Sequence, residues 1–257
     1  MPADRLAQAL AILKSGVIPV PPAEQIFVGD GDYLNISSEF LGYFVKLGRL
    51  LPSDIVLDIG CGIGRMAAGL ACYLDGQAGG AYIGFDPVCE GIEWCRENVT
   101  ASFPHCSFHW VDFHNSHYNP EGRIRVGDYR FPMAAASIDF AILTSVLTHL
   151  PAVDVEAYLI ELSRLLKPDG RMLATAYLFD GPAPPRLPHM PFIDFSIADP
   201  DYPGQWHVAG YPPMAAVAFS ESEFARMVAN RTGRTPSIMK GRWQGGAGPW
   251  FQDLVLA

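Results

Sequence analysis

Long hydrophobic runs are missing from this chain of 257 residues. A helix that crosses a bilayer needs about 20 consecutive apolar residues, and no stretch of the sequence reaches that length. Residues 1–5 also lack the basic start and apolar core of a secretory signal. The sequence therefore predicts a cytoplasmic protein without a membrane span.

Positive charge is scarce as well. The chain holds 18 Lys and Arg residues against 27 Asp and Glu residues, a formal net charge of −9. Binding to a nucleic-acid backbone depends on clustered Lys and Arg side chains that neutralise phosphates, and this sequence lacks such clusters. We therefore expect no nucleic-acid partner, and RNA and DNA are set aside as substrates.

Cysteines are few, and their spacing is not that of a metal site. The five cysteines are Cys61, Cys72, Cys89, Cys95 and Cys106. An odd number without paired spacing favours free thiols in a reducing compartment. Asp112, Asp154 and Asp180 follow no metal-binding pattern of a known family, so we expect no metal.

The composition that remains is typical of a folded enzyme-sized domain. Apolar residues make up 49% of the chain and charged residues 18%, which favours a well-buried core over disorder. At this length the default expectation is one large α/β domain with additions.

An apolar run that enters a glycine-rich turn is the most informative feature of the sequence. Residues 55–57 predict a buried parallel strand, and apolar side chains at helical spacing after the turn predict a helix packed onto it. The glycines recur as Gly60-x-Gly62-x-Gly64. Strand, glycine turn and helix in this order indicate a cofactor loop.

The chemistry of this loop differs from that of a dinucleotide site. A dinucleotide fingerprint reads Gly-x-Gly-x-x-Gly and brings the pyrophosphate to a helix N-terminus. Here Asp58 precedes the first glycine by two residues. A carboxylate at that place repels a pyrophosphate but suits a ligand that carries an ammonium and a sulfonium, such as S-adenosylmethionine.

Further stretches of the sequence support the same ligand. They are 81–87, a strand that ends in an acid, 107–113, a third strand followed by Asp-Phe, 137–151, a fourth strand and its loop, and 165–173, which closes a helix at a Pro-Asp-Gly turn and opens a fifth strand. With these motifs the chain, from residue 55 to its C-terminus, resembles the class I S-adenosylmethionine-dependent methyltransferases.

The resemblance implies an α/β fold, a Rossmann-like seven-stranded mixed sheet with an antiparallel C-terminal hairpin. Strands near 237–243 and 250–256, joined across the glycines of 245–248 and preceded by a helix near 221–229, are typical of that hairpin. A dehydrogenase sheet, in contrast, would stay parallel.

The resemblance also implies where S-adenosylmethionine binds. Asp86 would hold the ribose hydroxyls, Asp112 the adenine amino group, and Phe113 would flank the ring. The full set of expected cofactor contacts is Asp58, Ile59, Gly60, Cys61, Gly62, Asp86, Pro87, Asp112, Phe113 and Thr144.

We expect an N-terminal helical lid over residues 1–53 and a methyltransferase domain over 54–257. Two amphipathic helices are predicted in the lid, around 6–13 and 40–45. Between them, residues 29–35 form either a mobile lid loop, with Tyr33 reaching the cofactor or the acceptor, or a capping loop that begins the second helix.

Two insertions follow the third and fifth strands, at the edge of the sheet where open α/β folds bind ligands. The first, 113–132, is longer than a normal loop and holds His114, His117 and Tyr118. The second is a cap insertion at 179–215, where proline and aromatic residues favour a substrate cap over a purely structural extension.

His149 is the candidate catalytic residue, because it follows the fourth strand on the expected cofactor side. An alcohol must lose its proton during methyl transfer, an amine need only be neutral, and a carboxylate needs no base. We expect O-methylation of a small molecule or glycan, with N-methylation of a small amine as the alternative. His149 could instead be a structural residue satisfied by backbone, and the loop histidines His114, His117, His189 and His207 are weaker candidates.

Other interpretations stay open at this stage. Arg65 could pair with the methionine carboxylate or an acidic acceptor, or extend to solvent. The chain could use a dinucleotide as an oxidoreductase or epimerase, or keep the pocket as a non-catalytic S-adenosylmethionine-binding protein. The acceptor itself could be a sugar, a polyketide or peptide metabolite, or a lipid-linked glycan, since aromatic faces serve all of them.

Overall fold

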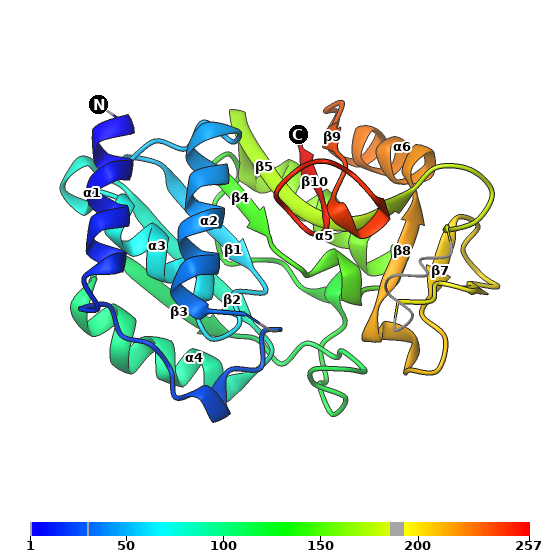
Figure 1. Cartoon of the computed structure of the whole chain (residues 1–257), viewed down its shortest axis with the longest axis horizontal. Helices are drawn as coiled ribbons and strands as arrows, with labels where there is room; N and C mark the ends of the chain where they lie inside the picture. The colour runs from blue at the N-terminus through cyan, green and yellow to red at the C-terminus, as the bar shows by residue number, and fades with distance from the viewer. Residues whose placement is uncertain (1, 30, 186–192) are drawn as a thin grey trace. The chain divides into compact units, whose positions relative to one another are not determined.

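The structure is a computed structural model that describes residues 2–29, 31–185 and 193–257 (Figure 1). The chain divides into two compact units. The first unit comprises Met1–Val111, Ser137–Ile142 and Lys167–Arg171, and the second comprises Asp112–Ala136, Leu143–Leu166 and Met172–Ala257. The segment expected as a separate lid, 1–53, belongs to the first unit.

A parallel sheet forms the centre of the first unit. Its strands are β1 (Ile55–Ile59), β2 (Ala81–Asp86), β3 (Cys106–Trp110) and β4 (Ile138–Leu143), in the order β3-β2-β1-β4. All three pairings are parallel, so the carboxyl ends of the strands share one edge. The predicted parallel strands are confirmed, and the nearly continuous apolar sequences of β1 and β4 reflect burial on both faces.

Helices cover this sheet in the first unit. They are α1 (Pro2–Lys14), α2 (Tyr33–Lys46), α3 (Arg65–Tyr73) and α4 (Cys89–Cys95), which continues into the π-helical turn η3 (Arg96–Thr100), with short 3₁₀ turns η1 (Ala23–Gln25) and η2 (Gly76–Ala78). The helices α1 and α2 lie beside α3 (Figure 1). They bury Leu6, Leu13, Leu41 and Phe44, so the predicted amphipathic faces are confirmed.

The second unit contains the antiparallel C-terminal strands. Its strands are β5 (Leu166–Phe179, of which 167–171 belong to the first unit), β6 (Ile197–Ala198), β7 (Gln205–His207), β8 (Val217–Ser220), β9 (Ser237–Met239) and β10 (Asp253–Leu256). β10 pairs antiparallel with both β5 and β9, which confirms the predicted hairpin. The two strands are shorter than expected, because the 3₁₀ turn η7 (Arg242–Gln244) interrupts the chain between them.

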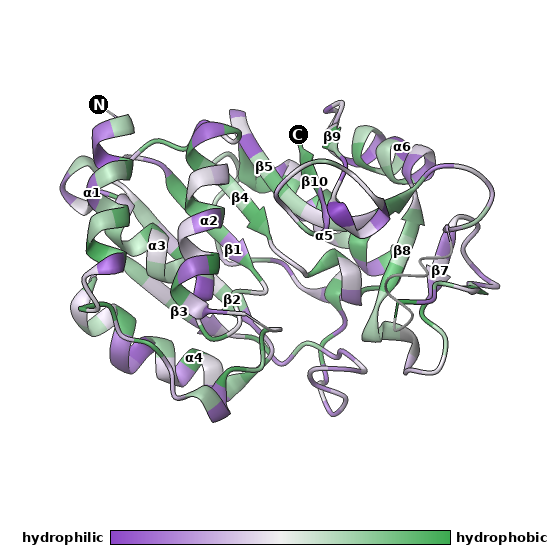
Figure 2. Cartoon of the chain, in the orientation of Figure 1, coloured by the Kyte–Doolittle hydropathy of each residue, from purple (hydrophilic) through white to green (hydrophobic). Residues whose placement is uncertain are grey.

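The described residues contain ten strands, three more than the seven expected. The extra strands are β6, β7 and β8. β8 runs parallel to the last three residues of β5, and β7 pairs antiparallel with β8 and β6. The cap insertion 179–215 thus supplies β6 and β7, and β8 follows it with three hydrophobic residues, 217–219 (Figure 2).

The predicted start of the fifth strand needs a correction. The Pro168-Asp169-Gly170 turn was expected to precede the strand, whereas β5 already begins at Leu166. A Cβ on Gly170 would lie 2.9 Å from the carbonyl oxygen of Ile138. Gly170 is therefore favoured by the close approach of backbone rather than by a turn.

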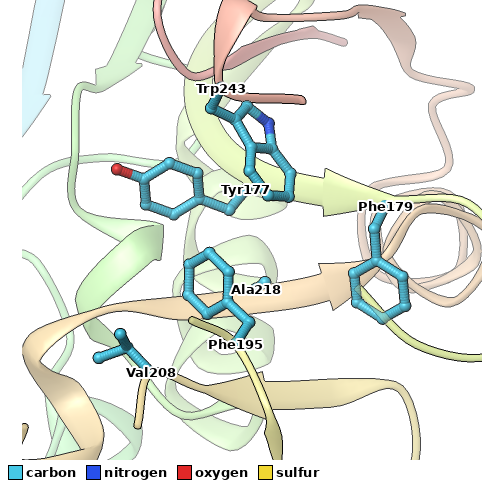
Figure 3. Packing of buried hydrophobic residues seen from close by; sticks show 6 residues of the cluster. All are labelled: Tyr177, Phe179, Phe195, Val208, Ala218 and Trp243. Carbon is cyan, nitrogen blue, oxygen red and sulfur yellow. The ribbon is translucent and has the colours of Figure 1, made fainter. Parts of the chain in front are cut away.

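The helices of the second unit are α5 (Ala152–Leu165) and α6 (Glu221–Thr232), with 3₁₀ turns η4 (Val126–Asp128), η5 (Leu147–His149) and η6 (Pro213–Ala215). Both α-helices were predicted. Within this unit an aromatic cluster packs around Tyr177 and Trp243, whose ring centroids are 5.2 Å apart (Figure 3). Phe195, from the cap segment, contacts both rings, so the cap is anchored to the core of its own unit.

No helix among the described residues is long and apolar enough to cross a membrane.

Candidate functional site

The glycine turn after β1 has the backbone conformation that only glycine adopts readily. Gly60, Gly62 and Gly64 have φ angles of 77°, 55° and 82°. The N–H groups of Gly60 and Cys61 donate hydrogen bonds of 2.8 and 3.1 Å to the carbonyl of Phe85 on β2. The predicted order of strand, turn and helix is confirmed, because α3 begins directly after Gly64.

Asp58 lies buried at the mouth of this turn. The hydroxyl of Tyr82 donates a hydrogen bond of 2.6 Å to Oδ2 of Asp58, while Oδ1 has no hydrogen-bond partner among the described residues. Burial raises the pKa of Asp58 to about 7, the bond from Tyr82 opposes this rise, and the nearby charge of Asp86 adds to it. A buried carboxylate oxygen without a partner is costly, and a cationic ligand group would satisfy it.

Asp86 closes the other side of the turn. Its Oδ2 accepts a hydrogen bond of 2.7 Å from the N–H of Gly62, and its Oδ1 accepts one of 2.8 Å from Val88. Burial raises the pKa of Asp86 to about 6, although both backbone bonds lower it. Each oxygen keeps a second lone pair, so the carboxylate can still accept from ligand hydroxyls.

The expected contacts Ile59, Cys61 and Pro87 also lie at this turn. Ile59 and Cys61 are buried. Pro87 offers its carbonyl oxygen to the indole N–H of Trp110 at 3.0 Å, and Trp110 itself remains 41% exposed. An exposed indole beside Asp86 was not anticipated from the sequence.

The N-terminal segment packs directly on the glycine turn. A Cβ on Gly62 would lie 2.4 Å from Cγ1 of Val28. Arg65 donates hydrogen bonds to the carbonyls of Val28 and Gly29, an arrangement that neither interpretation of Arg65 foresaw. The sequence did not point to Val28, because the apolar run 26–28 is too short to carry a periodic signal.

Residues 29–35, of which 30 lies outside the described residues, include the cap of α2. Asp32 accepts a hydrogen bond of 2.8 Å from the N–H of Asn35, so the capping interpretation is realised. Tyr33 is buried, and its hydroxyl donates 2.9 Å to the carbonyl of Ile63 in the glycine turn. Tyr33, the first residue of α2, therefore stabilises the glycine turn through this hydrogen bond.

The three other expected cofactor residues belong to the second unit. Asp112 accepts hydrogen bonds from Arg123 at 2.7 Å and from Asn119 at 3.2 Å, and these bonds hold its pKa below the usual range. Phe113 is buried, and its ring packs edge-on against Tyr129 at 5.0 Å. The assignment of Asp112 and Phe113 to the adenine stays a prediction.

Thr144 follows β4 and keeps a polar atom for a ligand. Its Oγ1 is buried and has no hydrogen-bond partner in the described part of the chain. The next residue, Ser145, has a φ of 60°, which is uncommon outside glycine and costs conformational energy. The Ser145 N–H donates 2.7 Å to the hydroxyl of Thr175, so the loop is held in this conformation.

His149 ends the turn η5 and has a defined tautomer. Its Nδ1 lies 3.1 Å from the carbonyl oxygen of Met214, and a carbonyl only accepts, so Nδ1 carries the hydrogen. The other ring nitrogen, Nε2, is then an unprotonated acceptor. Burial lowers the pKa of His149 below 6.5, and His117 lowers it further, which keeps the ring neutral at pH 7.

Two rings from the first insertion surround this imidazole. The ring of His117 stacks on His149 at 5.7 Å with an interplanar angle of 6°, and Tyr118 meets it edge-on at 5.3 Å. Met214 belongs to the second insertion. Both predicted insertions therefore contact His149.

The remaining histidines have local partners or lie outside the described residues. His114 binds the carbonyl of Pro120 at 3.1 Å within its own loop. His207 pairs with Asp199 at 2.6 Å inside the cap. The expectation for His189 concerns a residue in 186–192, which the structure does not describe.

The glycine turn fits the ligand that the sequence predicts. Asp58 offers an unpartnered oxygen for an ammonium, and Asp86 offers lone pairs for ribose hydroxyls. Among the described residues, no group of three or more His, Cys, Asp or Glu side chains is placed to hold a metal ion.

Comparison with known families supports the same ligand. The family model described as "Methyltransferase domain" matches residues 57–174, which include the glycine turn, both acidic residues and His149. The match thus covers the strands that carry the predicted motifs.

Solved structures share the fold at low sequence identity. A protein from Pyrococcus horikoshii is 15% identical with a TM-score of 0.55, over 90% of this chain and 93% of that one. The 1,6-didemethyltoxoflavin-N1-methyltransferase of Burkholderia thailandensis, solved with 1,6-didemethyltoxoflavin and S-adenosylhomocysteine, is 19% identical with a TM-score of 0.53, over 100% and 88% of the two chains.

Coclaurine N-methyltransferase, solved with N-methylheliamine and S-adenosylhomocysteine, is 14% identical with a TM-score of 0.52, over 93% of this chain and 65% of that one. The chain spans 52% of the length of a Bacillus subtilis protein that it matches with a TM-score of 0.41. The three likenesses with TM-scores of 0.52 to 0.55 establish the fold, a Rossmann-like mixed α/β sheet.

Proposed function

The chain carries a class I S-adenosylmethionine-dependent methyltransferase domain, and from this premise we propose that it methylates a hydroxyl group of a small organic molecule or glycan. S-adenosylmethionine supplies an activated electrophilic methyl group when bound. The protein's own contribution is to hold the acceptor in line and, for an alcohol, to take its proton.

The first unit holds the cofactor in this proposal. Oδ1 of Asp58 accepts from the ammonium of the methionine moiety, and Asp86 accepts from the ribose hydroxyls. Backbone of Ile59–Gly62 and the ring of Pro87 line the same ligand. In the same proposal Asp112 binds the adenine amino group, Phe113 flanks the adenine ring, and Thr144 donates a further hydrogen bond to the cofactor.

His149 acts as the general base. The observation that carries this assignment is the hydrogen bond from Nδ1 to the carbonyl of Met214, which leaves Nε2 as a lone-pair acceptor. The lowered pKa keeps that nitrogen unprotonated at neutral pH. A hydroxyl acceptor could then transfer its proton to Nε2 during attack.

The backbone bond of His149 also bears on the structural alternative. The ring is hydrogen-bonded to backbone at Met214, through Nδ1, and at Ala215. The support for a general base is the lone pair of Nε2, which follows from the bond between Nδ1 and the carbonyl of Met214.

N-methylation remains the second candidate, because two proteins with the same fold are N-methyltransferases. An amine needs no base beyond its own neutral form, so His149 would then serve only as a contact. The acceptor class decides between the two functions.

The test is a methyl-transfer screen with labelled S-adenosylmethionine against matched pairs of acceptors. Each pair carries an aromatic ring or a sugar, with either a hydroxyl or an amine as the nucleophile. Methylation of the hydroxyl member, lost in His149→Ala, supports the proposal. Methylation confined to amines, with His149→Ala close to wild type, overturns it.

A further inference from the structure

Asn115 stands at the point where the first insertion meets His149, and no motif of the sequence marks it. It lies in the second unit, two residues before His117. Its backbone pairs with that of Asn119 through hydrogen bonds of 3.0 and 2.9 Å, which close the tip of the insertion into a short loop. The loop thus has a fixed shape before its side chains are considered.

The two ends of the Asn115 amide bind different partners. Oδ1 accepts hydrogen bonds of 2.9 Å from the N–H of His117 and 3.0 Å from that of Tyr118. Nδ2 donates a hydrogen bond of 3.1 Å to the backbone carbonyl of His149. The acceptor end therefore shapes the loop, and the donor end ties the loop to the residue proposed as the base.

This tie determines what surrounds the imidazole. The ring of His117 lies parallel to that of His149 at 5.7 Å, and the ring of Tyr118 stands perpendicular to it at 5.3 Å. The two added rings also contact each other, at 4.6 Å. Met214, in the second insertion, supplies the carbonyl that accepts the hydrogen bond from Nδ1 of His149.

We propose that Asn115 is a positioning residue, whose amide fixes His117 and Tyr118 around His149 and so sets the proton affinity of the imidazole. The inference rests on the proposed role of His149. His117 and Tyr118 are the titratable groups that face His149 from the insertion, and the cap segment contributes backbone carbonyls at Met214 and Ala215. A released loop would expose the ring to water and remove His117.

The expected effect has a definite sign. Burial and the proximity of His117 both lower the pKa of His149, so loss of the loop contact should raise it towards 6.5. An imidazole with a higher pKa is protonated over a wider pH range. The rise of kcat with pH should then move to higher pH.

The experiment follows the imidazole signals of the full-length protein by NMR as the pH is changed, without cofactor or acceptor. The His149 signal is assigned from its absence in His149→Ala. Asn115→Ala removes both ends of the amide. Asn115→Ser retains a short acceptor for the loop N–H groups but cannot reach the carbonyl of His149, so it isolates the donor end.

The proposal predicts that both substitutions raise the pKa of His149. It also predicts that the pKa shifts of His149 caused by Asn115→Ala and by His117→Ala are not additive in the double variant. The reason is that Asn115 acts through the loop that carries His117. His114→Ala is the matched control, since His114 lies in the same insertion and its ring bonds to the carbonyl of Pro120. It should leave the His149 titration unchanged.

An unchanged His149 titration in folded Asn115→Ser would overturn the positioning role. So would equal and additive shifts from Asn115→Ala and His117→Ala. Circular dichroism reports whether each variant folds, and Asn115→Ser serves if Asn115→Ala does not. Because these measurements need no acceptor, they can fail while methyl transfer by His149 stands, and the acceptor screen can fail while they succeed.

Discussion

The hydroxyl of Tyr82 on β2 donates a hydrogen bond of 2.6 Å to Oδ2 of Asp58 on the neighbouring strand β1. Both side chains are buried, and the other oxygen of Asp58 has no partner among the described residues. The pair therefore holds one carboxylate oxygen in place and leaves the second for a ligand. This geometry explains how a buried acid can be kept beside a glycine turn.

The substitution Tyr82→Phe should weaken binding of S-adenosylhomocysteine about tenfold or more. A hydrogen bond to a charged group contributes roughly 1.5–3 kcal/mol, and its loss would release Asp58 and favour its protonated form. Calorimetry measures the affinity. Tyr73→Phe is the matched control, because Tyr73 is buried in the same unit and donates 2.8 Å to the carbonyl of Leu50 away from the turn. Equal affinity for S-adenosylhomocysteine in the two variants would show that Tyr82 does not contribute to cofactor binding.

Cofactor affinity should rise with pH through neutrality. Burial raises the pKa of Asp58 to about 7, so below that pH the acid is largely neutral and does not attract an ammonium. Asp86, with a pKa raised to about 6, contributes at the lower end of the same range. Calorimetry between about pH 5.5 and 8.5, roughly a unit and a half on each side of the pKa of Asp58, measures how cofactor affinity changes with pH. The same slope in Asp58→Asn would assign the dependence to another group.

The same two raised pKa values should affect stability without cofactor. Between the unfolded value near 4 and the folded values, the folded protein binds more protons than the unfolded chain does. The free energy of unfolding should therefore fall as the pH rises through this window. Added S-adenosylhomocysteine, which satisfies the ionised acids, should reduce that fall.

The substitution Gly62→Ala should abolish tight cofactor binding. Its Cβ would lie 2.4 Å from Val28, so either the turn or the N-terminal segment must shift. Gly79→Ala is a close control: Gly79 also has a positive φ, 92°, but nothing lies within 4 Å of the added Cβ. Both variants carry the backbone penalty of about 1–2 kcal/mol, and only Gly62→Ala carries the clash. A thermal shift with ligand that is equal in the two variants would contradict the assignment.

His149→Ala should lower kcat by about 10² to 10⁴ for a hydroxyl acceptor, with little change in cofactor affinity. In the wild type, kcat should rise as the pH passes the pKa of His149, which burial holds below 6.5, so activity should already level off near neutrality. An amine acceptor would give a profile that follows the amine. A His149→Ala enzyme within a few-fold of wild type would return His149 to a structural role.

Local sequence was sufficient to predict the strand, glycine turn and helix of the first unit. An apolar run, glycines that need positive φ and an amphipathic helix are all properties of neighbouring residues. The same applies to the acid that ends β2 and to the helix α5 after His149. The Rossmann-like sheet was implied by the resemblance to the methyltransferase family, and the observed strand order β3-β2-β1-β4 agrees with it.

Only the tertiary structure decided which side chains act together. Tyr82 lies 24 residues from Asp58, Asn115 lies 34 residues from His149, and Met214 lies 65 residues from it. Periodicity reports which face of an element is buried, but it carries no information on the partner across the fold. The tautomer of His149, the unpartnered oxygen of Asp58 and the contact of Val28 with Gly62 depend on such distant pairs, because a hydrogen bond or a clash is set by position in space and not by position along the chain.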